Sequence, residues 1–178
     1  HHPSSPSTDF RVVRPGETDL HLFSMHPVAL AQRIVLPAAP ALIAGTAKAA
    51  WLSPDGEIEV LTRNEAATRA KTTPPFLCHA KSVARRLNIP VFPAYDVLEL
   101  YAFARPAIFC LPTPRGLARA LDLVTPGGGI EAEASCLIAA VEALLQELSL
   151  ARDAEARAIA HAMERGGWAW GEAVLRAL

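Results

Sequence analysis

The segment "PFLCHAKSVARRL", residues 75–87, places a histidine at the end of an apolar run and cations on the helix-like run that follows. Active sites are often built where a buried strand gives way to a helix, and a histidine there can transfer protons or bind a ligand. Lys81 and Arg85 are four residues apart and should share a helix face, while Arg86 points about a quarter-turn away. His79 is therefore part of a working site, the remnant of one, or a plain strand-end residue.

The common motifs of catalysis and nucleotide binding are absent from the sequence. It has no GxxxxGK(S/T) phosphate loop, no GxGxxG, no GxSxG and no HExxH. Ser82 and Ser135 have no evident histidine or aspartate partner, so the sequence gives nucleophilic catalysis no support. His161 is expected to be a helix-surface or packing residue.

Charge is unevenly distributed along the 178 residues, although the net charge is only −1. Residues 63–119 carry nine lysines and arginines against three acids, whereas residues 122–178 carry four arginines against nine acids. A basic middle beside an acidic end is compatible with nucleic-acid contact. A solvated helix face next to an acidic surface is the alternative.

The cysteines and the hydropathy predict a reduced, cytoplasmic protein without a membrane span. Cys78, Cys110 and Cys136 are odd in number and widely spaced in apolar contexts, so we expect three buried thiols, without zinc or disulfides. The longest apolar stretch, "VLPAAPALIAG", contains two prolines and is too short to cross a bilayer. No charged start leads into an uninterrupted apolar segment, so no secretory signal is indicated.

The pattern of apolar residues predicts an α/β fold with a mixed sheet flanked by helices. A strand in "PALIAG" should be followed by a hairpin over 48–62 around "PDG", and Asn64 should cap a short helix. The run 75–79 reads as a buried strand. Residues 131–150 form the clearest helix, with a continuous stripe that should lie against the sheet: Leu137, Val141, Leu144, Leu145 and Leu148.

Composition divides the chain into three parts. Residues 1–24 are polar and rich in serine and proline, as a tag or leader would be, and Met25 is a plausible start of the domain. Residues 25–150 should form the α/β domain, and 151–178 a helical extension of two helices hinged at Gly166-Gly167. Trp168 and Trp170 alternate so that one should be buried and the other exposed, where it could stack on a base or a partner.

The order of segments between residues 38 and 150 resembles the DEDD (DnaQ-like) 3′–5′ exonuclease family. The hairpin and "PFLCHAKSVARRL" precede "YDVLELYAFARP" and "PTPRGLARALDL", and a long alanine-rich helix follows. In that family a strand ending in His-Asn runs into a helix that bears a catalytic aspartate. The resemblance implies an RNase H-like sheet with a helical C-terminal extension.

The resemblance also implies that the catalytic carboxylates have been lost. The family holds two divalent metals between four carboxylates, but Gly45 and Ala47 fall where the first aspartate and glutamate should be. His79 matches the histidine of the second motif, Ala84 replaces its metal-binding aspartate, and Glu133 is at best the last acid. Too few hard ligands remain for two cations. We therefore expect no catalysis, no metal and no cofactor, and His79 as the remnant of a motif.

Degenerate domains of this kind occur ahead of the motor in some bacterial DinG-type ATP-dependent DNA helicases, and the chain looks like the amino-terminal part of such a helicase. The expected partners are DNA, in its single-stranded form, and the motor domain of the same polypeptide. The expected DNA-binding residues are the cations beside the former cleft: Lys81, Arg85, Arg86, Arg115 and Arg119.

Two alternatives stay open at this point. One is an active metal-dependent exonuclease with rearranged ligands, drawn from Glu57, Glu59, Asp96, Glu99 or Glu133. The other is a protein-interaction domain whose contact surface consists of the acidic C-terminal helices and the tryptophan pair.

Overall fold

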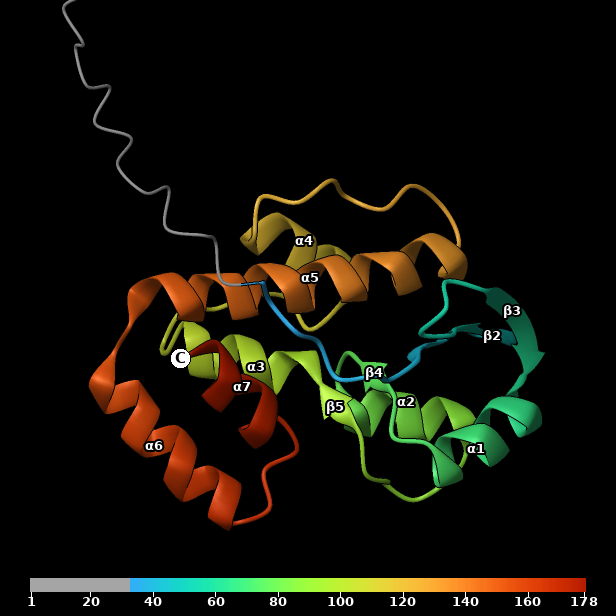
Figure 1. Cartoon of the computed structure of the whole chain (residues 1–178). Coiled ribbons are helices and arrows are strands. Elements are labelled where there is room, and N and C mark those ends of the chain that lie inside the picture. Colours follow the sequence, from blue (N-terminus) through green and yellow to red (C-terminus); the bar gives the residue numbers. More distant parts are fainter. Residues whose placement is uncertain (1–32) are drawn as a thin grey trace, which may run out of the picture. The chain divides into compact units, whose positions relative to one another are not determined.

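The computed structural model describes residues 33–178, so the predicted leader over 1–24 and the domain start at Met25 lie outside the described residues. The elements labelled in Figure 1 follow one another along the chain as strands first and helices later. They are β1 (Ala41–Ala44), β2 (Lys48–Leu52), β3 (Ile58–Thr62), α1 (Arg63–Thr72), β4 (Phe76–Leu77), α2 (Ala80–Leu87), β5 (Tyr95–Asp96), α3 (Val97–Ala104), α4 (Pro114–Ala120), α5 (Ile130–Ala151), α6 (Ala154–Arg165) and α7 (Gly171–Ala177).

The five strands form one mixed sheet in the order β3-β2-β1-β4-β5. β2 is antiparallel to both β1 and β3, whereas β4 and β5 continue the sheet parallel to β1. Gly56, with φ 91°, lies in the turn that joins β2 to β3, and its N–H donates to the Ser53 carbonyl at 3.0 Å. The predicted hairpin over 48–62 and the predicted α/β fold with a mixed sheet are confirmed.

Two local predictions differ from the structure. Only Phe76 and Leu77 of the predicted strand 75–79 pair in the sheet, because the backbone turns into the left-handed region at His79, with φ 67°. Asn64 lies inside α1 and does not cap it. The cap is Thr62, whose hydroxyl accepts the Glu65 N–H at 3.2 Å and donates to the Glu65 carboxylate, as in a capping box.

Helix α5 is the core helix on one face of the sheet. Its predicted stripe is buried throughout, from Leu137 to Leu148, and it packs on β1 and β2. Among the described residues α5 alone is long and apolar enough to cross a membrane, but a buried stripe packed on a sheet is the mark of a core helix in a soluble fold. The cytoplasmic location stays a prediction.

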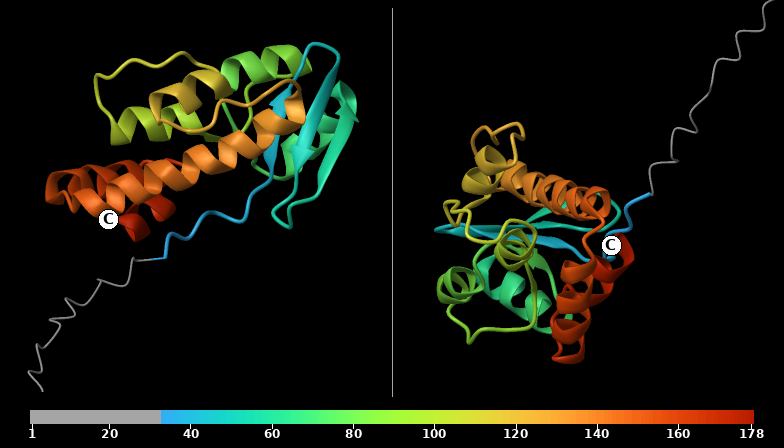
Figure 2. Two further views of the ribbon diagram at one scale, coloured as in Figure 1. Left: turned by 90° about the horizontal axis from the view of Figure 1, so that it is seen from above. Right: turned by 90° about the vertical axis from the view of Figure 1, so that its left-hand side faces the viewer.

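The opposite face of the sheet is covered by α1 and α2 (Figure 2, right). Side chains from β1, β2 and β4 meet those helices in a second, smaller cluster that contains Leu42, Trp51 and Leu77. Alternate residues of β1 therefore face different clusters, since Ile43 belongs to the α5 side and Leu42 to the α2 side. The central strand β1 is thus packed on both faces.

The last two helices pack into the same core as the rest of the described chain. Trp170 is fully buried, stacks on Phe76 with ring centroids 5.7 Å apart, and donates from Nε1 to the Asp96 carbonyl at 2.8 Å. Trp168 is half-buried, not exposed as predicted, because it packs on Phe103 and donates to Glu99 at 3.3 Å. The predicted helices on either side of Gly166-Gly167 are present as α6 and α7.

Leu144→Ala tests the assignment of α5 as the core helix. Leu144 has no exposed surface, so truncation is expected to lower the free energy of unfolding by about 2–5 kcal/mol. Leu150→Ala on the same helix is the control, because Leu150 is 74% exposed and should change stability by no more than about 0.5 kcal/mol. Urea unfolding measures both, and equal losses would contradict the packing described.

Candidate functional site

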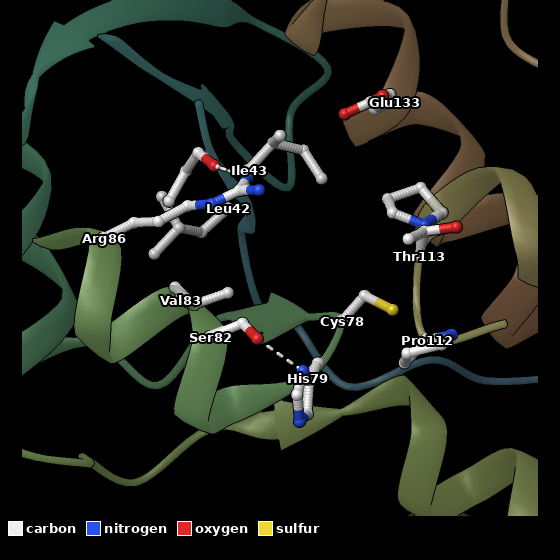
Figure 3. Close-up of a pocket in the computed structure, with 12 residues that line it drawn as sticks. Leu42, Ile43, Cys78, His79, Ser82, Val83, Arg86, Pro112, Thr113 and Glu133 are labelled. Carbon is white, nitrogen blue, oxygen red and sulfur yellow. Dashed lines mark hydrogen bonds between the residues drawn. The ribbon is translucent and has the colours of Figure 1, made fainter. Parts of the chain in front are cut away.

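A cavity of about 310 Å³ lies at the carboxyl ends of β1 and β4, between α2 and the start of α5 (Figure 3). Ligands of α/β sheets commonly bind at this end of the strands. Its walls come from β1, the β4–α2 junction, the segment before α4, and α5: Leu42, Ile43, Ala44, Cys78, His79, Ser82, Val83, Arg86, Pro112, Thr113, Pro114 and Glu133.

His79 has a strained backbone conformation at the N-terminus of α2. It is the N-cap residue of that helix, and φ 67° is an uncommon conformation for a residue with a side chain. Its imidazole Nδ1 lies 2.5 Å from the Ser82 hydroxyl, a pair drawn in Figure 3. Ser82 therefore does have a histidine partner, contrary to the expectation from the sequence, because one helical turn brings position 82 back over position 79.

Asp96 holds this junction in place from the neighbouring strand. Its side chain is buried, and its carboxylate accepts the N–H groups of His79 at 3.1 Å, Ala80 at 2.8 Å and Leu98 at 3.0 Å. Those amides begin α2 and α3, where unpaired N–H groups and the helix dipole favour an anion. Asp96 thus has a structural role, because it caps both helices.

Arg86 contributes a cationic side chain to the lining of the cavity. Its guanidinium donates to the Ala44 carbonyl at 2.7 Å, across the end of β1. Within residues 33–178 no carboxylate forms an ion pair with it. Glu133 is the acid of the cavity and lies on the α5 wall (Figure 3).

The other predicted DNA-binding cations do not line the cavity. Lys81 and Arg85 are exposed on α2 and do not line the cavity, whereas Ser82, Val83 and Arg86 on the same helix do, although Arg86 is exposed as well. Arg115 and Arg119 are exposed on α4, and Arg115 follows the cavity residue Pro114. Of the five cations expected to bind DNA, Arg86 is the one that lines this cavity.

The positions that the resemblance assigns to the catalytic motifs fall into two groups. His79 and Glu133 line the cavity, but Gly45, Ala47 and Ala84 do not. A side chain at Gly45 would meet the Lys48 carbonyl, since a Cβ there would lie 2.7 Å from that oxygen. Ala84 is only 2% exposed, packed within the protein.

The acids proposed for a rearranged metal site lie on different elements with different contacts. Glu59 forms an ion pair with Arg69, which lowers the pKa of the Glu59 carboxyl. Partial burial raises the pKa of Glu99, with the nearby Asp96 charge as a second cause, and the Trp168 hydrogen bond opposes them. Glu57 is exposed at the hairpin, Asp96 caps two helices, and Glu133 alone lines the cavity.

No group of three or more histidine, cysteine, aspartate or glutamate residues within 33–178 is placed to hold a metal ion. The structure therefore does not assemble the ligand set of the rearranged nuclease. The expectations that the chain binds no metal and no cofactor stay predictions.

The three thiols are free, and they are not equally buried. Cys78 and Cys136 are buried as expected, but Cys110 is half-buried on the loop before α4. Burial is the largest cause that raises the pKa of all three. Thiols with raised pKa values are protonated at neutral pH and are weak nucleophiles, so Cys78 belongs to the wall of the cavity and not to its chemistry.

Comparisons with protein-family models, with curated proteins and with solved structures found no match to this chain. The exonuclease family of the sequence analysis therefore remains a resemblance. The lining of the cavity is the best guide to function: it includes Arg86, which forms no ion pair within residues 33–178, together with His79, Ser82 and Thr113.

Gly45→Asp tests whether the fold admits an acid where the family has one. The 2.7 Å approach of a Cβ to the Lys48 carbonyl requires the turn to shift, which should cost roughly 1–3 kcal/mol of unfolding free energy. Ala47→Asp is the matched control, since Ala47 is exposed in the same turn and should change stability little. Denaturant unfolding of both variants decides, and a Gly45→Asp protein as stable as Ala47→Asp would contradict the steric argument.

Proposed function

We propose that this chain is a non-catalytic, exonuclease-like module that binds single-stranded DNA at the cavity, within a polypeptide that carries a DinG-type helicase motor. The observation that carries the proposal is Arg86, whose guanidinium lines a cavity at the end of the sheet without a carboxylate partner among residues 33–178. A guanidinium in that situation is suited to a phosphate oxygen.

The fold supports a distant relationship to exonucleases. A three-stranded meander is followed by two parallel strands, with helices on both faces, as expected for an RNase H-like sheet. The cavity lies where the resemblance puts the substrate, beside the first strand and the helix after the histidine motif. The helicase motor as the partner is carried over from the resemblance.

The wall opposite Arg86 limits what the cavity can hold. Glu133 contributes a negative charge, so a phosphate is stable only near Arg86, where His79 and Ser82 add polar groups. A space of about 310 Å³ is small beside a DNA duplex, and this supports unpaired DNA as the proposed ligand.

Arg86→Gln tests the proposal directly. Loss of a charged phosphate contact should weaken binding of a fluorescent oligothymidylate about tenfold at low salt and reduce the salt slope by about one. Arg85→Gln removes the same charge one position away, outside the cavity, and should have a much smaller effect. Glu133→Gln should bind more tightly because it removes a like charge from the site.

Fluorescence anisotropy over a salt series measures the affinities, and urea unfolding verifies that each variant is folded. Parent protein that fails to bind at low salt would overturn the proposal. So would an Arg86→Gln variant that binds as tightly as Arg85→Gln.

A further inference from the structure

The loop between α3 and α4 exposes large apolar side chains next to the cavity. Phe109 is 82% exposed, and its neighbours Ile108 and Leu111 are 58% and 51% exposed. An aromatic ring left in water forfeits most of the free energy that burial would provide. Large apolar side chains that stay exposed beside a charged site indicate a binding surface.

The loop is anchored, so the exposure of Phe109 is a fixed feature. Arg105, where the loop begins, donates to Glu147 on α5 at 3.0 Å and to the Ala120 carbonyl on α4 at 2.6 Å. At its other end the loop presses on α4, where a Cβ at Gly116 would lie 2.2 Å from the Leu111 carbonyl. Prolines 106 and 112 restrict the backbone between these anchors.

The same loop leads directly into the wall of the cavity. Pro112 and Thr113 line the cavity, and Phe109 is three residues before Pro112, so their Cα atoms are at most about 11 Å apart. The exposed Arg115 follows on α4. The exposed Phe109 is thus part of the same loop as two residues that line the cavity with Arg86.

We propose that Phe109 is a stacking platform for an unpaired base of the DNA strand that the cavity holds. The inference rests on the proposed function and extends it from the phosphate to the base. Single-strand binders combine cations that track the backbone with aromatic rings on which bases stack, without preference for sequence. A base within a duplex has no free face for such a ring, so the platform selects unpaired DNA.

The test compares two probes, an oligothymidylate and the same backbone with abasic sites. Phe109→Ala should weaken binding of the oligothymidylate about fivefold or more and leave the abasic probe unchanged. Phe109→Tyr keeps the ring and should keep the affinity. Ile108→Ala is the matched control, because it removes an exposed aliphatic side chain from the same loop. Arg86→Gln should weaken both probes.

The outcomes separate this inference from the proposed function. If Phe109→Ala binds both probes like the parent while Arg86→Gln weakens both, the platform is overturned and the phosphate site survives. If Ile108→Ala matches Phe109→Ala, or if Phe109→Ala alters self-association in sedimentation and not DNA binding, the loop is a protein contact and the platform is overturned. If the parent binds no DNA, both proposals fall together.

Discussion

Two helices of this protein begin at one buried carboxylate, and the site depends on that arrangement. Asp96 accepts the first amides of α2 and an amide at the start of α3, and its own carbonyl accepts the indole N–H of Trp170. Within residues 33–178 it is the one buried charged side chain. The positive ends of two helix dipoles compensate for its desolvation. The β4–α2 junction, the β5–α3 junction and the segment before α7 are therefore joined at a single residue.

The cavity follows from this junction. The bond from the His79 amide to Asp96 holds the backbone in its left-handed turn, which ends β4 early and sets the imidazole against Ser82. The same turn fixes the rotation of α2, and Arg86 on that helix reaches across the end of β1 to the Ala44 carbonyl, although both Arg85 and Arg86 are exposed. The buried carboxylate at position 96 accepts three amides, whereas a side chain at Gly45 would lie too close to the Lys48 carbonyl unless the turn shifted.

Local patterns in the sequence were sufficient for the larger elements. The stripe of α5 and the "PDG" turn are short-range signals, and both predicted the observed structure. The bond from Arg86 to the Ala44 carbonyl and the capping role of Asp96 were missed because the partners are distant in sequence: Ala44 is 42 residues from Arg86, and His79 is 17 from Asp96. Contacts between residues so far apart in sequence produce no local motif. The cap at Thr62 could have been found, since a glutamate three residues later completes a capping box.

The stability of Asp96→Ala, measured by denaturant unfolding beside Asp153→Ala, tests this account most directly. Asp153 is an exposed cap of α6 alone, and its loss should cost about 0.5–2 kcal/mol. Asp96→Ala leaves amides of two helices without their acceptor in a partly buried place, so the expected loss is about 2–5 kcal/mol. A larger loss for Asp96→Ala than for Asp153→Ala is the predicted result. Equal losses would contradict the claim that the junction depends on Asp96.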